Sequence, residues 1–235
     1  MKQQEYWDNV SGQKEFTTPF QAEEFSKYVK RDSCILDLGC GYGRTLDELY
    51  HNGYHKLIGI DFSSGMIGRG RKQFPYLDLR VKQETKIDLP DASVDAVILF
   101  AVLTCIRTNE EQEQLLSEIR RVLKPQGILY VNDFLLNTDE RNLLRYEKYK
   151  EAYGIYGVFE LPEGAVCRHH NETWIKHLLK DFSEVEYSHL TFRTMNGHKS
   201  NGFYFIGKLN STDRAVSKWK TGKSRDKDNM TRNGI

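Results

Sequence analysis

The stretch at 34–44, CILDLGCGYGR, constrains this chain more than any other part of its sequence. Four apolar residues around one aspartate indicate a short buried strand, and Gly39, Gly41 and Gly43 then follow at alternate positions. Glycine tolerates positive φ angles and lets a ligand approach the backbone closely. A helix-like pattern at 45–50 comes next, and its first turn would present free N–H groups. Strand, glycine turn and helix together predict a nucleotide-like pocket at the carboxyl end of a parallel strand.

Apolar runs of strand length alternate with helical patterns as far as residue 134. The runs that have the pattern of strands lie at 34–38, 56–60, 77–81, 94–100 and 128–131. The clearest helical pattern covers 110–123, where apolar residues recur every three or four positions. This alternation predicts an α/β sheet of parallel strands joined by right-handed crossovers.

The C-terminal third has a different pattern. Residues 137–170 are polar and aromatic, and we expect an inserted cap of one helix plus a loop there. A helix at 171–179 follows, with Asn171 as its candidate cap. Two further strands, 185–194 and 202–209, flank Asn196 and Gly197, and an Asn-Gly pair in that position is a strong hairpin signal.

Pattern and charge divide the chain into three parts. Residues 1–30 carry aromatic side chains at helix-like spacing, and we expect a helical segment that covers one sheet edge, forms a lid over the glycine turn, or does both. Residues 31–210 hold the α/β domain with its cap insert. Residues 211–235 contain seven basic and three acidic residues without apolar periodicity, so this basic tail is predicted to be disordered.

Composition narrows the range of partners. The formal net charge is only +1, and the +4 of the tail leaves −3 for the rest, so no global electrostatic case for nucleic acid arises. The longest apolar run, 96–103, is far shorter than the roughly 20 residues that a membrane helix needs. No signal peptide pattern opens the sequence, and the four cysteines lack CxxC spacing. We therefore expect free thiols and a cytoplasmic location.

Two ligand classes use a strand, glycine turn and helix in this order: nicotinamide or flavin dinucleotides, and S-adenosylmethionine. The dinucleotide fingerprint GxGxxG has its third glycine where the helix packs on the strand. Arg44 occupies that place here, and its side chain would crowd both the helix and a pyrophosphate. Asp37 would repel a pyrophosphate but would suit an ammonium and a sulfonium group. The stretch therefore favours S-adenosylmethionine.

Four ordered stretches resemble motifs of the class I S-adenosylmethionine-dependent methyltransferases. They are ILDLGCGYG at 35–43, GIDFSSGM at 59–66, DLPDASVD at 88–95 and RVLKPQG at 121–127. The predicted C-terminal hairpin is similar to the antiparallel pair that closes this family's sheet. The resemblance implies a Rossmann-like, seven-stranded, mostly parallel sheet with helices on both faces and a small cap insert after the fifth strand. It also implies an enzyme that uses S-adenosylmethionine and releases S-adenosylhomocysteine.

The resemblance also implies cofactor contacts at matching positions. Asp37 would hold the methionine amino end, and Asp61 would accept both ribose hydroxyls, because a carboxylate has two oxygens. Phe62 and Met66 would flank the adenine, or else simply pack in the core. The remaining candidates for cofactor binding are Trp7, Gly39, Cys40, Gly41, Gly43, Glu84, Thr85 and Phe100. Of these, either Glu84 or Thr85 could accept from the adenine amine.

Candidates for the acceptor site lie in the N-terminal segment and the insert, which usually shape the pocket in this family. No catalytic residue is identified, but Tyr6, Tyr146, His169 and His170 are candidates. A histidine could act as a base or orient the acceptor, or the pair could be a loop feature without a role. The candidates for substrate binding are Thr18, Arg141, Arg145 and Arg168. The arginines could meet an acidic acceptor or form a solvated face. Two adjacent histidines do not predict a metal site.

The leading functional hypothesis is in-line methyl transfer to a small molecule, a reaction in which the protein mainly aligns the reacting groups. The tyrosine-rich insert favours an enclosed pocket over an open groove. A tRNA or protein methyltransferase that uses the basic tail as an electrostatic anchor is one alternative. A non-catalytic S-adenosylmethionine-binding module is another. The expected partner is a small-molecule acceptor, without nucleic acid or membrane.

Overall fold

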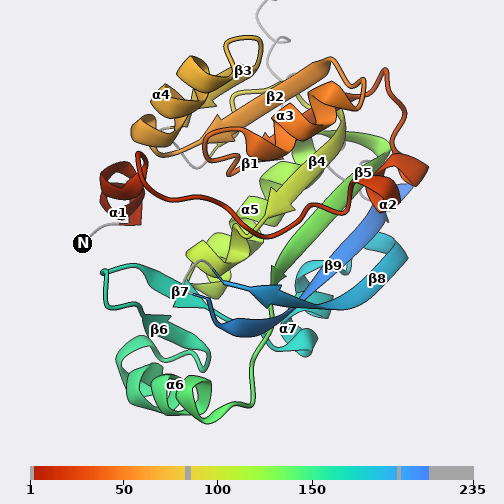
Figure 1. The fold of residues 1–235 in the computed structure, drawn as a ribbon. Coiled ribbons are helices and arrows are strands. Elements are labelled where there is room, and N and C mark those ends of the chain that lie inside the picture. The colour runs from red at the N-terminus through yellow and green to blue at the C-terminus, as the bar shows by residue number, and fades with distance from the viewer. Residues whose placement is uncertain (1–2, 83–85, 195–196, 212–235) are drawn as a thin grey trace, which may run out of the picture.

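A computed structural model of the chain describes residues 3–82, 86–194 and 197–211. Its centre is a seven-stranded sheet with the order β3-β2-β1-β4-β5-β9-β8 (Figure 1). The strands are β1 (Cys34–Leu38), β2 (Lys56–Asp61), β3 (Asp78–Val81), β4 (Val94–Phe100), β5 (Leu123–Phe134), β8 (Phe182–Arg193) and β9 (Lys199–Leu209). β1 to β5 run parallel, and β9 is antiparallel to both β5 and β8. The predicted fold class is confirmed, including the C-terminal hairpin.

The central strand β1 lies between β2 and β4, where Leu36 pairs with Ile58 on one side and Val97 on the other. Leu36 and Val97 are fully buried, as expected for a parallel sheet that is covered on both faces. This register brings the carboxyl ends of β1, β2 and β4 to one edge of the sheet. The glycine turn follows β1 at that edge.

Helices cover the two faces of the sheet. One face packs against α2 (Ala22–Tyr28), α3 (Arg44–His51) and α4 (Ser64–Gln73). The other packs against α5 (Asn109–Val122) and α7 (Glu172–Leu178). None of the helices in the described residues is long and apolar enough to cross a membrane.

Two helices begin at residues whose side chains cap them, and the second of these, Asn171, is the cap that the sequence predicts. The Ser63 hydroxyl accepts the Met66 N–H at 3.1 Å at the start of α4, and the Asn171 amide oxygen accepts the Trp174 N–H at 2.7 Å at the start of α7. Helix α5 ends at Val122, and β5 begins at once, so that Lys124-Pro-Gln-Gly127 belongs to the strand and not to a separating turn. The fifth strand is therefore longer at its start than the sequence predicts.

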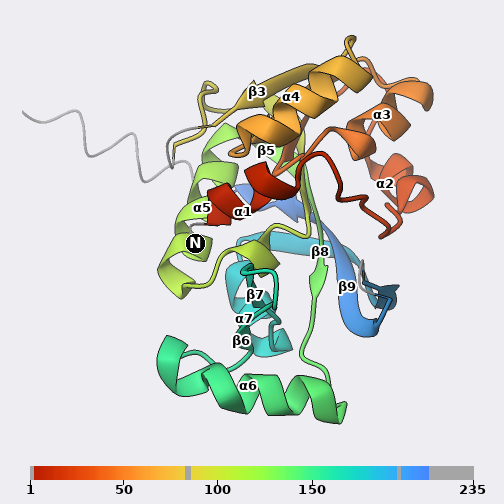
Figure 2. The same cartoon turned by 60° about the vertical axis from the view of Figure 1, so that its left-hand side comes forward.

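The cap insert lies beyond the end of β5 (Figures 1 and 2). It contains α6 (Glu140–Tyr153) and a two-stranded antiparallel hairpin of β6 (Val158–Glu160) and β7 (Val166–Arg168). The expectation of one helix plus a loop is therefore wrong for the second half. Each of these strands has only three residues, which is too short for a period-two pattern to be visible in the sequence.

The N-terminal segment contacts both the sheet and the start of helix α4. Phe25 on α2 is fully buried against the sheet side that holds Tyr130. Farther upstream, α1 (Gln3–Val10) is joined to the start of α4, because the Asp8 carboxylate accepts the Gly65 N–H at 2.9 Å and the Ser63 hydroxyl at 2.7 Å. A lid function of 1–30 stays a prediction. Of the predicted basic tail, only Ser211 lies within the described residues.

Candidate active site

A cavity of about 590 Å³ lies at the carboxyl ends of the parallel strands, between the N-terminal segment and the cap. Its lining comes from β1, β2, β4, α1, the segment after α1, and the cap. Among the described residues that line it, the carboxylates are Asp37 and Asp61, and five lysines and arginines line it as well. These cations are Lys14, Arg44, Lys82, Arg141 and Arg145.

The glycine turn forms the wall of the cavity that follows β1. Gly39 and Gly41 have φ angles of +82° and +56°, a region that favours glycine. A Cβ on Gly39 would lie 2.5 Å from a methyl group of Val102, and one on Gly41 would lie 2.4 Å from the Phe16 ring. Any side chain at either position would therefore collide with a neighbouring wall of the cavity. Cys40, between them, also lines the cavity, and burial raises the pKa of its thiol well above the usual range.

Gly43 differs from the other two glycines because it does not line the cavity. It precedes α3 with a φ of +91°, and a Cβ there would lie 3.3 Å from Leu77 and Leu79. The structure therefore gives Gly43 a role in helix placement, and the prediction that it contacts the cofactor is not supported. Arg44 follows it and donates to the Thr18 carbonyl at 2.7 Å, so its side chain extends toward the N-terminal segment.

The Asp37 side chain lines the cavity. It is nevertheless buried, with 1% of its surface exposed. Its Oδ1 atom is buried and accepts no hydrogen bond within the described residues. Burial and the neighbouring Asp61 charge raise the pKa of this carboxyl from 3.8 to about 7, against the opposing effect of Arg44. Burying a carboxylate without a partner costs free energy. A cationic ligand group beside Asp37 would offset that cost, so Asp37 is suited to bind such a group.

Asp61, at the end of β2, is held in one orientation. Its Oδ2 accepts the Gly41 N–H and its Oδ1 accepts the Ser63 N–H, both at 2.8 Å. Burial raises its pKa, and the two N–H donors oppose that shift. Each oxygen keeps a further lone pair, so the fixed carboxylate can accept two hydroxyl groups from a ligand in the cavity.

Flat or flexible apolar side chains lie beside Asp61. Trp7, Phe62 and Met66 all line the cavity, and Phe100 lines it from the end of β4. Such surfaces suit an aromatic ring system. The predicted adenine contacts Glu84 and Thr85 lie outside the described residues.

The N-terminal segment covers this half of the cavity. From this segment, Tyr6, Trp7 and Phe16 line the cavity. The Phe16 ring stacks on Tyr42 in the glycine turn, with centroids 5.1 Å apart and planes 12° apart. Tyr6 is 2% exposed, and burial raises its pKa to about 12, so its hydroxyl stays protonated and cannot serve as a base near neutrality. Thr18, a candidate for substrate binding, also lines the cavity.

The cap supplies the opposite half of the cavity. Arg141 and Arg145 line it from α6, and His169 lines it after β7. Two thiols, Cys105 and Cys167, also face it, and burial raises the pKa of both, that of Cys167 to about 12. These thiols are therefore neutral. Among the described residues, no group of three potential ligands could hold a metal ion.

Tyr146 does not line the cavity, although it acts on a residue that does. It is fully buried, and its hydroxyl lies 2.6 Å from Nδ1 of His169. The Asn137 side chain lies 3.2 Å from the same nitrogen. Tyr146 therefore orients His169 and does not itself meet a ligand.

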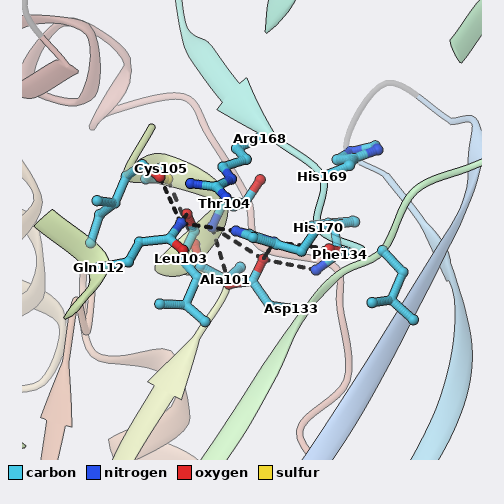
Figure 3. A network of polar contacts seen from close by, with 12 residues as sticks. Ala101, Leu103, Thr104, Cys105, Gln112, Asp133, Phe134, Arg168, His169 and His170 are labelled. Atoms are coloured by element: carbon cyan, nitrogen blue, oxygen red, sulfur yellow. Dashed lines mark hydrogen bonds and ion pairs between the residues drawn. The ribbon is translucent and has the colours of Figure 1, made fainter. Parts of the chain in front are cut away.

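His170 and Arg168 lie in a separate polar network behind the cavity (Figure 3). His170 Nδ1 lies 3.1 Å from the Phe134 carbonyl, and its Nε2 lies 2.9 Å from the Gln112 amide. Arg168 donates to the Arg107 carbonyl at 3.0 Å. Neither side chain lines the cavity, and burial lowers the pKa of His170 to about 3. The structure therefore does not support a catalytic role for His170 or a substrate contact by Arg168.

Asp133 organises this network from the end of β5. Its buried carboxylate accepts the backbone N–H of Thr104 at 3.1 Å and of Phe134 at 2.8 Å. Thr104 belongs to a short turn of 3-10 helix, η1 (Leu103–Cys105), which carries part of the cavity wall. Asp133 therefore fixes that wall.

Several other lining residues escaped the sequence reasoning. They are Gln3, Gln4, Lys14, Lys82, Phe134, Leu161, Ala165, Thr194 and Ser200. Most lie on loops or on the hairpin β6–β7, where no periodicity marks an inward side. An aromatic residue directly after Asp133 at the predicted end of β5 was the one available signal, and it pointed to Phe134.

Residues 36–131 match a family described as a methyltransferase domain. A probable S-adenosylmethionine-dependent methyltransferase of Mycolicibacterium smegmatis is 35% identical over 107 residues, which are 46% of this chain and 38% of that protein. The mouse eEF1A lysine and N-terminal methyltransferase is 29% identical over 115 residues, or 45% and 16% of the two chains. This chain thus spans less than half the length of these curated relatives.

A solved structure covers more of the chain. The crystal structure of a SAM-dependent methyltransferase from Methanosarcina mazei superposes with a TM-score of 0.77 at 25% sequence identity. The match covers 83% of this chain and 99% of that one. It therefore extends beyond residues 36–131, which match the methyltransferase domain.

Proposed function

Because the chain belongs to the class I S-adenosylmethionine-dependent methyltransferase family, we propose that it methylates a small molecule enclosed in the cavity. The observation that carries this proposal is the division of the cavity. Its two carboxylates lie at the ends of β1 and β2, while the half under the cap is lined by cations and apolar groups. One continuous cavity therefore offers a site for the donor and, beside it, a site for an acceptor.

The donor half fits S-adenosylmethionine. Bound there, the cofactor would supply an activated methyl group on a positively charged sulfur. The unpartnered Oδ1 of Asp37 would accept from the ammonium group, and this would offset the cost of burying the carboxylate. Asp61, already fixed by two N–H donors, would hold the ribose hydroxyls. Trp7 and Met66 would flank the adenine.

The chain's own contribution to the reaction is alignment and exclusion of water. Methyl transfer requires nucleophile, carbon and leaving sulfur in line, and fixed positions for the two reactants remove much of that entropic cost. Phe16, which stacks on Tyr42 in the glycine turn, covers the donor half, and α6 with the hairpin β6–β7 covers the acceptor half. The cover that the N-terminal segment and the cap provide supports a small acceptor, because a folded protein or an RNA would need a wide approach to the same edge of the sheet.

The donor assignment is tested by calorimetric titration of S-adenosylmethionine into the wild type and two variants. Asp61→Ala removes the acceptor of the ribose hydroxyls, and we expect at least a hundredfold weaker binding. Asp88→Ala removes the same charge from an exposed position outside the cavity and should bind like the wild type. Equal affinity of Asp61→Ala and the wild type would contradict the assignment.

The acceptor class is tested with methyl-labelled S-adenosylmethionine and three fractions of a cell extract: compounds below about 1 kDa, proteins, and RNA. The proposal predicts label in the small-molecule fraction with the wild type and none with Asp61→Ala. Label confined to the protein or RNA fraction would overturn the small-molecule assignment while leaving methyl transfer intact.

A further inference from the structure

The cap half of the cavity combines an arginine that has no carboxylate partner among the described residues with a histidine whose hydrogen-bonding state is fixed by its neighbours. Arg145 lines the cavity and lies on the Phe159 ring, with its Cζ atom 3.5 Å from the ring centroid. Its Nε is buried and forms no hydrogen bond within the described residues. In the described part of the chain, no carboxylate lies within ion-pair distance of this guanidinium. Arg145 is therefore a charged group that faces the cavity with donor capacity to spare.

Arg141, one turn earlier on the same helix, is different. It lies 3.7 Å from the Asp139 carboxylate and is exposed. Lys14, which also lines the cavity, lies 3.9 Å from Glu163. Among these cations of the acceptor half, Arg145 is the one without a carboxylate neighbour of its own. A ligand anion would meet the least competition there.

The hydrogen bonds around His169 determine which ring nitrogen carries the proton. The Tyr146 oxygen accepts the Asn137 backbone N–H at 3.3 Å. Its own proton is then free to be donated to Nδ1 of His169, 2.6 Å away. Nδ2 of Asn137 lies 3.2 Å from the same nitrogen, and it also donates to the Leu135 carbonyl at 3.0 Å and to the Ser200 hydroxyl at 3.1 Å. Nδ1 is therefore an acceptor, and the proton of the neutral imidazole resides on Nε2.

Aromatic packing fixes the plane of this ring. Phe134 stacks on His169 with centroids 5.5 Å apart and planes 13° apart, and Phe159 meets it edge-on at 4.9 Å. Burial and the nearby Arg145 charge also lower the pKa of His169 well below its usual range, so the ring stays neutral. Tyr146 and Asn137 occupy the Nδ1 side of the ring. Because the ring lines the cavity, we infer that its Nε2–H group faces the cavity.

Phe159 brings the two donors together, because Arg145 lies on its face and His169 lies at its edge. We propose that these two side chains form an anion subsite, in which the Arg145 guanidinium and the His169 Nε2–H bind a carboxylate of the methyl acceptor. This inference rests on the proposed function, whose acceptor it describes as an apolar body that carries one carboxylate. The apolar body would contact Phe134, Leu161 and Ala165.

The same geometry changes the predicted role of His169. A general base needs an unprotonated nitrogen toward its substrate, whereas His169 directs its N–H there. His169 is therefore a positioning residue that donates to the acceptor. If methyl transfer removes a proton from the acceptor atom, a group other than His169 must accept that proton. Otherwise the acceptor atom must already be unprotonated when it reacts.

Binding tests the subsite without knowledge of the true substrate. The full-length protein is saturated with S-adenosylhomocysteine and then titrated with ten matched pairs of carboxylate and primary amide, such as benzoate with benzamide and octanoate with octanamide. We expect at least one acid to bind, its amide to bind at least tenfold more weakly, and Arg145→Gln to weaken the acid at least tenfold. Arg145→Lys should recover part of that loss. Lys148→Gln removes an exposed charge from the same helix and should have no effect.

The outcomes separate the two proposals. If the wild type fails to bind S-adenosylhomocysteine, the proposed function fails. If S-adenosylhomocysteine binds but no acid does, or acid and amide bind alike, or Arg145→Gln leaves the acid affinity unchanged, the anion subsite alone is wrong.

The histidine state is tested separately by nitrogen NMR of protein labelled at its histidine imidazoles. The structure predicts that the His169 resonances are those of a neutral ring with the proton on Nε2 at pH 7, and that Tyr146→Phe alters them. His169→Gln, which lacks the imidazole, identifies the signals. A proton on Nδ1, or a charged imidazolium at pH 7, would contradict the assigned donor role.

Discussion

Asp37→Asn should make the unliganded protein more stable while it weakens cofactor binding. The variant keeps the shape of the side chain and removes a charge that the fold buries without a hydrogen bond to Oδ1. Most substitutions of buried polar residues destabilise a protein. A gain in stability here would therefore identify Asp37 as a residue whose charge the fold holds for a ligand.

The magnitude follows from the pKa of Asp37, which burial raises from 3.8 to about 7. Below pH 3.8 the carboxyl is protonated in both the folded and the unfolded state, so its charge costs nothing. As the pH rises to about 7, the unfolded state loses its proton first, and folding becomes less favourable. A shift of about three units corresponds to about 4 kcal/mol, since each unit is about 1.4 kcal/mol. Asp37→Asn has no ionisable carboxyl at this position, so its unfolding free energy should not fall by this amount.

The assay is urea unfolding of the unliganded wild type and Asp37→Asn at several pH values between 4 and 8.5. The difference in unfolding free energy should be near zero at the acid end and reach a few kcal/mol in favour of the variant above pH 7. Asp88→Asn, at an exposed position, should follow the wild type throughout. A variant less stable than the wild type at pH 8, or a difference that does not change with pH, would refute the reasoning.

Three other outcomes follow from the described contacts. Gly39→Ala should lower the unfolding free energy by about 1–3 kcal/mol in urea, because its Cβ would meet Val102 at 2.5 Å with a φ of +82°; unchanged stability would contradict the packing. Tyr146→Phe should lower it by about 1–3 kcal/mol, because it leaves the Asn137 N–H without its acceptor; a loss below about 0.5 kcal/mol would mean that water replaces the hydroxyl. S-adenosylmethionine should change the tryptophan fluorescence of the wild type, and Trp7→Phe should abolish that change, because Trp7 lines the cavity.

The donor half of the site was predictable because short-range rules govern it. A strand, a turn that needs positive φ, and a helix start are local features, and Asp37, Gly39, Gly41 and Asp61 all lie where the motifs placed them. The sheet order also followed, because alternating strands and helices allow few topologies. Gly43 was the exception: its spacing matched the motif, but its packing against Leu79 is visible only in three dimensions.

The acceptor half was less predictable because distant segments build it. Arg141 and Arg145 were found from their helical spacing, but only the structure shows that Arg145 faces the cavity without a carboxylate partner. His169 and His170 are adjacent in the sequence, yet one lines the cavity and the other hydrogen-bonds to Gln112 in the network behind it. The sequence pattern of a segment does not indicate which of its side chains an element from a distant part of the chain will cover.

The central claim is that one cavity holds the donor at its carboxylate end and the acceptor at its cap end. A crystal structure of the full chain with S-adenosylhomocysteine tests this most directly. The account predicts the amino group of the ligand at Asp37, its ribose hydroxyls at Asp61, and its sulfur directed toward the half that contains Arg145 and His169. A ligand bound away from both aspartates, or with its sulfur turned away from the cap, would contradict it.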